Sequence, residues 1–158
     1  MSKLSSDTNI KAGSIRDIGR ELSSIKTGVK LAFIYDANIP EEAVKDCQSS
    51  MLEAGFDVAK IKIAGGEGCK NIEKYQMLIS LLIDEEISRD DMIVVMGGGA
   101  LCDLAGFIAA SYLRGIDYVQ IPSTLLAMVD SSIGGKTGIN IDKGKNLIGA
   151  FHTPRLVF

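Results

Sequence analysis

The stretch VVMGGGALCDLAGF, residues 94–107, decides the fold. A β-branched, apolar run ends in three glycines, and an apolar segment with helical spacing follows directly. We expect a strand that ends at Met96, a tight GGGA turn, and a helix from Leu101. Such a turn gathers unpaired backbone N–H groups at the positive end of the helix dipole, and glycine lets a ligand's oxygens approach the main chain. The turn predicts either a pyrophosphate seat or only close packing of strand and helix, because the spacing is not G-x-G-x-x-G.

Asp103 is an isolated carboxylate near the start of this predicted helix. Its side chain could cap free N–H groups of the first turn, which is a purely structural role. It could equally accept hydrogen bonds from ligand hydroxyls beside bound phosphates. Both interpretations stay open on the pattern alone.

Predicted helices and strands alternate on both sides of this turn. Helical spacing or end signals mark residues 14–25, 40–55, 71–87 and 100–113, and strand patterns mark residues 30–36, 56–66, 91–96 and 117–122. This alternation predicts an α/β fold, a Rossmann-like parallel sheet with helices on both faces and ligands at the carboxyl ends of the strands. The 158 residues, with 46% hydrophobic content, suit one domain.

Composition narrows the classes of partner and compartment. The net charge of -3 argues against a nucleic-acid surface or an anionic membrane, and no stretch is apolar enough to span a bilayer. The polar N-terminus lacks a secretory signal, so we expect a cytoplasmic protein with a flexible tail over residues 1–13. Cys47, Cys69 and Cys102 suit free thiols, and a single histidine, His152, excludes a multi-histidine metal site within this chain.

A second glycine cluster, DSSIGGKTGIN, occupies residues 130–140. It is not a Walker A loop, because the required first glycine would fall at Asp130. The preceding PSTLLAMVD reads as a short helical piece, which predicts that Lys136 lies on a loop. Together with Lys145 and Asn146, Lys136 forms either a polar constellation for a ligand or a solvated loop.

Residues 97–158 resemble the N-terminal nucleotide-binding domain of the 3-dehydroquinate synthase family, which catalyses the second step of the shikimate pathway. The segments YDANI (35–39) and GGEGCK (65–70) also fall where that family carries D-x-N and G-E-x-x-K, so the resemblance extends from about Val29 to Phe158. It implies the N-terminal domain of a dehydroquinate synthase-like fold over residues 1–158.

The resemblance implies NAD as cofactor, lying across the carboxyl ends of the strands. Asp36 and Asn38 would lie near the adenosine ribose, and Glu67 and Lys70 would also hold the nucleotide. The remaining cofactor residues implied are Gly98, Gly99 and Ala100 at the pyrophosphate, Asp103 at the nicotinamide half, the hydroxyls of Ser123 and Thr124, and Lys136 and Lys145.

The same resemblance implies a substrate, the sugar acid phosphate DAHP. Asp130, Lys136 and Asn146 would contact it, and Arg114 would reach the phosphate-bearing substrate of a neighbouring subunit, which implies a homodimer. In the family, NAD transiently oxidises a ring hydroxyl, phosphate leaves, hydride returns, and ring opening with aldol closure gives 3-dehydroquinate, a carbon-oxygen lyase reaction.

The family's divalent metal, zinc or cobalt, is held by a glutamate and two histidines of a second, helical domain. None of these falls within the 158 residues, so we expect a fragment that binds NAD without turnover. Alternatives are a related sugar-phosphate cyclase, an iron-dependent alcohol or glycerol dehydrogenase domain, or a non-catalytic nucleotide-binding module. Cys102 stands where the family usually has glycine, and it is either an activated thiol at a helix start or a packed small side chain.

Overall fold

A computed structural model of the chain describes residues 14–131 and 134–158. The flexible tail expected over residues 1–13 lies outside the described residues. Helices and strands alternate in the expected order up to the fourth strand. The helical elements are η1 (Ser14–Asp17), α1 (Ile18–Ile25), α2 (Glu41–Glu53), η2 (Glu67–Cys69), α3 (Ile72–Asp84), α4 (Gly99–Ser111), η3 (Tyr112–Arg114) and η4 (Ala127–Ser131). The strands are β1 (Lys30–Asp36), β2 (Asp57–Ile63), β3 (Met92–Gly97), β4 (Asp117–Pro122), β5 (Lys136–Ile141), β6 (Gly144–Phe151) and β7 (Leu156–Val157).

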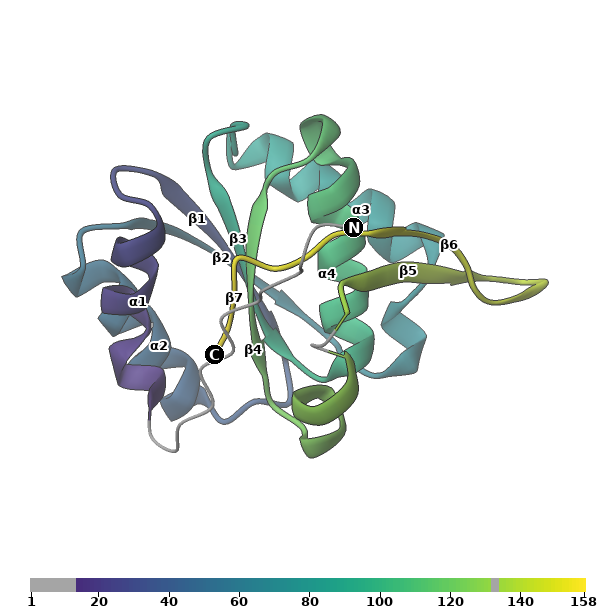
Figure 1. Cartoon of the computed structure of the whole chain (residues 1–158), viewed down its shortest axis with the longest axis horizontal. Coiled ribbons are helices and arrows are strands. Elements are labelled where there is room, and N and C mark those ends of the chain that lie inside the picture. The colour runs from purple at the N-terminus through teal and green to yellow at the C-terminus, as the bar shows by residue number, and fades with distance from the viewer. Residues whose placement is uncertain (1–13, 132–133) are drawn as a thin grey trace.

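The centre of the fold is a five-stranded sheet in the order β2-β1-β3-β4-β7, and each neighbouring pair is parallel. Figure 1 shows α1 and α2 on one face of this sheet and α3 and α4 on the other. The predicted α/β fold with a Rossmann-like parallel sheet and helices on both faces is therefore confirmed. Because all five strands run the same way, their carboxyl ends meet at one edge.

Alternating strand residues build two separate cores, one on each face of the sheet. On β1, Leu31 and Phe33 point toward α1 and α2, whereas Ala32 and Ile34 point toward α3 and α4. All four side chains are fully buried. Burial on both faces explains why β1 and β3 read as continuous apolar runs rather than as alternating patterns.

The expectation that Lys136 lies on a loop is wrong. Lys136 begins β5, which pairs with β6 in an antiparallel two-stranded sheet that projects beside α4 (Figure 1). The glycines before it misled the interpretation, because Gly134 and Gly135 form a turn with positive φ angles of 97° and 65° that leads into the strand. The strand signal was the alternation of Thr137 and Ile139, which are buried against α4.

The short helical piece expected before this cluster is present in part, as the π-helical turn η4. The two-residue strand β7 had no signal in the sequence, since its register is set by pairing with Val119 and Gln120 of β4.

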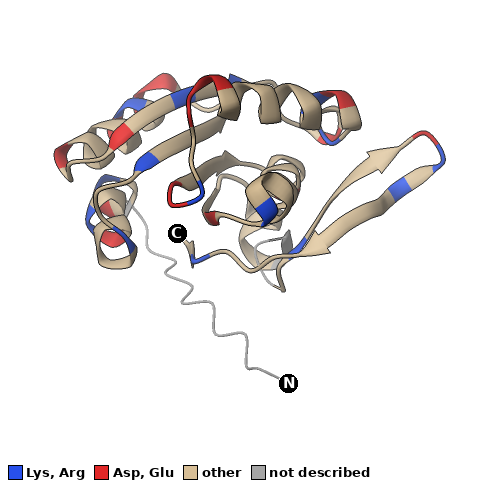
Figure 2. Ribbon diagram, turned by 90° about the horizontal axis from the view of Figure 1, so that it is seen from above, with Lys and Arg blue, Asp and Glu red and all other residues tan. Residues whose placement is uncertain are grey.

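Among residues 14–131 and 134–158, none of the helices has the length and hydropathy that a bilayer span requires. Figure 2 shows acidic and basic residues mixed along the helices, in line with the small net charge.

We predict that Gly19→Ala destabilises the chain by about 1–3 kcal/mol. A Cβ atom at Gly19 would lie 1.9 Å from the carbonyl oxygen of Ser50, so α1 would have to move off α2. Urea unfolding followed by circular dichroism measures the change in the free energy of unfolding. Gly68→Ala is the matched control, because a Cβ atom there meets nothing within 4 Å, and an equal loss in both variants would contradict the close-packing argument.

Candidate functional site

At the carboxyl edge of the sheet, the residues that follow β3 and β4 lie side by side. β3 ends at Gly97, which pairs in register with Pro122 at the end of β4. The N–H of Ser123 donates to the carbonyl oxygen of Gly97 at 2.8 Å. A Cβ atom added to Gly98 would lie 3.5 Å from the Thr124 methyl group. The structure thus brings the glycine turn together with Ser123 and Thr124, as the parallel topology requires.

The turn between β3 and α4 contains backbone N–H groups that have no acceptor among the described residues. α4 begins at Gly99, two residues earlier than expected, and Gly98 is its N-cap with an extended backbone at φ -75° and ψ 172°. No side chain caps this helix start, and the first closing bond runs from Cys102 N–H to Gly98 O at 3.0 Å. Within the described residues, the N–H groups of Gly99 and Ala100 have no hydrogen-bond acceptor. Two amide donors at the positive end of a helix dipole are what an anionic ligand group needs.

Asp103 lies on the first turns of α4 and faces a cation from another element. The ammonium of Lys70 forms a short ion pair with one oxygen of the Asp103 carboxylate. Lys70 is only 4% exposed, so its charge depends on this partner for compensation. The sequence suggested that Lys70 and Asp103 each hold the nucleotide, and the structure joins them to each other at the edge where the nucleotide was expected.

Asp36 ends β1 and is held in a fixed orientation. Its Oδ1 accepts hydrogen bonds from the backbone N–H of Asn38 at 3.0 Å, from the Asn38 side-chain amide at 3.1 Å and from Gly65 N–H at 3.2 Å. A Cβ atom at Gly65 would lie 2.0 Å from the carboxylate, so only glycine permits this approach. Asp36 and Asn38 therefore form one unit at the edge of the sheet, next to the loop that leads to η2.

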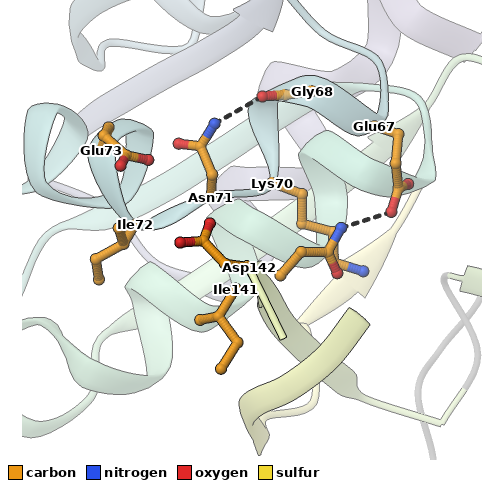
Figure 3. Close-up of a pocket in the computed structure, with 9 residues that line it drawn as sticks. Glu67, Gly68, Lys70, Asn71, Ile72, Glu73, Ile141 and Asp142 are labelled. Atoms are coloured by element: carbon orange, nitrogen blue, oxygen red, sulfur yellow. Dashed lines mark hydrogen bonds between the residues drawn. The ribbon is translucent and has the colours of Figure 1, made fainter. Parts of the chain in front are cut away.

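Glu67 on η2 lies against the β5–β6 hairpin. Its Oε1 accepts from the side-chain amide of Asn140 at 2.7 Å, the bond drawn as a dashed line at Glu67 in Figure 3. Lys145 Nζ lies 3.8 Å from the same oxygen. Lys145 is exposed, so this ion pair adds little stability. A cavity of about 390 Å³ opens beside this contact, lined by Glu67, Gly68, Lys70, Asn71, Ile72, Glu73, Asn140, Ile141 and Asp142. Sequence reasoning missed Asn140, whose only signal was its place at the end of TGIN.

The residues expected to contact substrate lie on the β5–β6 hairpin, on η4 and on η3. Lys136 and Asn146 lie on β5 and β6 with exposed side chains. Asp130 falls in η4, and its side chain lies outside the described part of the structure. Arg114 lies beyond the far end of α4, about 20 Å along the helix from the glycine turn, and does not join the site within one chain.

The three cysteines are buried, and burial keeps their thiols protonated and unreactive. Desolvation raises the pKa of Cys47 and Cys102 to about 12 and that of Cys69 to about 11. Cys102 is 1% exposed and packs at the start of α4 with its Sγ 3.6 Å from Gly97 O. Of the two interpretations of Cys102, the structure supports the packed small side chain, because burial outweighs the helix dipole. All three thiols are free, as the sequence predicts.

His152 has a structural role, because its side chain packs and hydrogen-bonds within the fold. Its ring stacks on Tyr118 with centroids 5.3 Å apart, and its Nε2 donates to Ile116 O at 2.9 Å. In the described residues, no group of three or more His, Cys, Asp or Glu side chains is arranged to hold a metal ion.

A family profile described as 3-dehydroquinate synthase N-terminal matches residues 60–158. The chain belongs to the 3-dehydroquinate synthase family. A 3-dehydroquinate synthase of Clostridium acetobutylicum is 44% identical over 149 residues, which are 94% of this chain and 42% of that protein. The chain therefore spans about two fifths of the length of the curated synthases that it matches.

Solved structures of related enzymes share the fold. A 2-deoxy-scyllo-inosose synthase complexed with carbaglucose-6-phosphate, NAD+ and Co2+ is 28% identical with a TM-score of 0.81, over 89% of this chain and 40% of that chain. The 2-epi-5-epi-valiolone synthase ValA of Streptomyces hygroscopicus subsp. jinggangensis 5008, with NAD+ and Zn2+ bound, is 25% identical with a TM-score of 0.85, over 99% of this chain and 43% of that chain. Both of these neighbours were solved with NAD+ and a divalent metal ion bound.

We predict that the thiols of the folded chain react slowly with iodoacetamide at pH 8, because a pKa of about 11 or 12 leaves them protonated. As pH rises, Cys69 is alkylated first, since its pKa is the lowest of the three. The unfolded thiols ionise near pH 9 and the folded ones do not, so the free energy of unfolding falls as pH rises above 9. Mass spectrometry of peptides after timed alkylation, with and without denaturant, checks this order. Rapid labelling of Cys102 at pH 8 would contradict its packed state.

We predict that Asp103→Asn destabilises the chain by about 2–4 kcal/mol, because it leaves the buried Lys70 ammonium without a counter-charge. The double variant Lys70→Met, Asp103→Leu recovers part of this loss, since it removes both charges from the same place. Chemical unfolding of the two variants measures the difference. A double variant less stable than Asp103→Asn would show that the pair is not coupled.

Proposed function

We propose that the chain is the nucleotide-binding part of a 3-dehydroquinate synthase and that it binds NAD at the carboxyl edge of the sheet. The observation that carries this proposal is the β3–α4 turn, where the amides of Gly99 and Ala100 have no acceptor among the described residues. A pyrophosphate supplies the negative oxygens that such donors bind. The presence of NAD+ in two related cyclases supports NAD as the ligand.

The surrounding side chains suit the rest of a dinucleotide. Asp36 holds a carboxylate at the end of β1, where a ribose hydroxyl could donate to its second oxygen. The Ser123 and Thr124 side chains are exposed, and Thr124 lies beside Gly98. The ion pair with Lys70 orders the carboxylate of Asp103. This carboxylate can therefore accept a hydrogen bond from the nicotinamide half with little further desolvation of its charge.

The reaction proposed for the whole synthase is the conversion of DAHP to 3-dehydroquinate with loss of phosphate. NAD, when bound, supplies a hydride acceptor that is regenerated in the same cycle. The part played by this chain is to hold and orient the sugar acid. Lys136 and Asn146 would donate to substrate oxygens from the hairpin, and Asp130 would accept from a substrate hydroxyl. Donors aimed at developing negative charge are each worth about 3 kcal/mol in other enzymes.

Several features are assigned to the rest of the synthase polypeptide or to a second subunit. We propose that a divalent metal, zinc or cobalt, is held by a C-terminal helical domain of the synthase, as the family resemblance implies; the two related cyclases were solved with Co2+ and Zn2+. Arg114, far from the glycine turn, would act on the substrate of the partner in a homodimer. A cytoplasmic location is proposed with the biosynthetic role.

Related cyclases and dehydrogenases share this domain plan. Identity of 44% to a synthase against 28% and 25% to the two cyclases favours the dehydroquinate synthase assignment. A non-catalytic nucleotide-binding module is the alternative that a binding experiment on the chain addresses directly.

We predict that isothermal titration calorimetry detects NAD binding to the chain and that Gly98→Val weakens it at least about tenfold, which is the effect of losing one charge-assisted hydrogen bond. The extended backbone at Gly98 accepts a β-branched residue, so the fold survives while the side chain crowds the turn beside Thr124. Thr27→Val, at the opposite edge of the sheet, is the matched control. Equal affinity of the Gly98 and Thr27 variants would overturn the pyrophosphate position, and absence of NAD binding in all forms would overturn the proposed function in favour of a non-catalytic module that binds another nucleotide.

A further inference from the structure

Three hydrogen bonds converge on Asn140, near the end of β5. Its backbone N–H donates to Lys70 O at 2.8 Å, and its side-chain amide donates to Glu67 Oε1 at 2.7 Å. Its Oδ1 accepts from the backbone N–H of Asn146 at 3.0 Å. One side chain therefore touches η2 with its donor and β6 with its acceptor.

The bond to Asn146 has a conformational role. Asn146 adopts a positive φ of 55°, a left-handed conformation that asparagine tolerates better than most residues. It lies where the β5–β6 register shifts, between the pairs Ile139 with Ile148 and Ile141 with Gly144. In the described part of the structure, Asn146 is paired with no residue of β5, and the side-chain oxygen of Asn140 accepts its N–H instead. The direction of the Asn146 side chain, which follows from its backbone, therefore depends on Asn140.

We propose that Asn140 is a positioning residue that sets Asn146 on the hairpin according to the position of Glu67 on η2. The proposal rests on the proposed function, in which Glu67 belongs to the nucleotide side of the site and Asn146 to the substrate side. The side chain of Asn140 joins these two sides through a single planar amide. A change at Glu67, including contact with a nucleotide, is thus transmitted to Asn146.

Packing alone does not explain this side chain. The backbone bond from Asn140 to Lys70 already fastens β5 to η2 and does not involve the amide group. Thr137 and Ile139 bury the inner face of the hairpin against α4. The amide of Asn140, at the margin of the cavity shown in Figure 3, adds a directional link to Glu67 rather than buried apolar area.

The test measures solvent exchange of the Asn146 backbone amide by NMR in the ligand-free chain. Asn140→Ala removes the acceptor and is expected to speed exchange roughly fivefold, the effect of losing one hydrogen bond. Glu67→Ala removes the anchor of the Asn140 amide and is expected to speed exchange about two- to threefold, although Glu67 does not contact Asn146. The double variant is expected to match Asn140→Ala, because both changes act along one path.

Two references keep this comparison specific. Glu73→Ala removes another carboxylate of the same cavity, to which no hydrogen bond of Asn140 runs in the described part of the structure, and is expected to leave Asn146 unchanged. The Asn38 amide, bonded to Asp36, reports in each spectrum that the fold is intact. Unchanged exchange at Asn146 in Asn140→Ala or in Glu67→Ala, or effects that multiply in the double variant, would overturn the proposal.

A titration with NAD then separates this proposal from the proposed function. NAD is expected to shift the Asn146 amide resonance of the unmodified chain, and the shift is expected to disappear in Asn140→Ala while NAD still binds within about threefold of its original affinity. Failure of the unmodified chain to bind NAD would count against the proposed function alone, because the ligand-free exchange rates decide the role of Asn140 without it.

Discussion

The site depends on the geometry by which β3 passes directly into α4. A parallel strand delivers the chain to the carboxyl edge, and the helix that starts there cannot satisfy the N–H groups of its own first turn. Gly98 offers no side chain to cap them, so the N–H groups of Gly99 and Ala100, which have no acceptor among residues 14–131 and 134–158, lie at the positive end of the helix dipole. Asp36 and Asn38, and Ser123 and Thr124, lie beside this turn because β1 and β4 end at the same edge.

The charged groups on the two sides of this turn differ in how deeply they are buried. On the η2 side, the buried ammonium of Lys70 compensates the charge of Asp103 and fixes its carboxylate. On the hairpin side, Lys136, Lys145 and Asn146 are exposed on strands that have one face against α4. The first group is preorganised by burial, whereas the second is held mainly by hydrogen bonds such as those of Asn140.

Much of this arrangement was predictable, because it follows from local periodicity and from the rule that parallel strands share an edge. The buried runs at residues 30–36 and 91–96, the helix after GGGA and the gathering of Asp36, Gly98 and Ser123 all have such local causes. The hairpin was missed because Gly134 and Gly135 look like loop residues, and only packing of Thr137 and Ile139 against α4 shows that a strand follows. Nothing in the residues themselves indicated that Lys70 and Asp103, 33 positions apart, would neutralise each other.

By itself, the sequence determined the alternation of strands and helices, the glycine turn and the family, since each depends on residue types at short spacing. The tertiary structure alone decided which polar groups pair with each other and which remain exposed at the edge of the sheet. Glu67 on η2 and Asn140 on the hairpin are 73 positions apart, and their contact forms only once η2 and the hairpin pack beside α4. Pairings between distant polar side chains depend on distance and burial in space, and neither quantity is encoded in any local stretch of the chain.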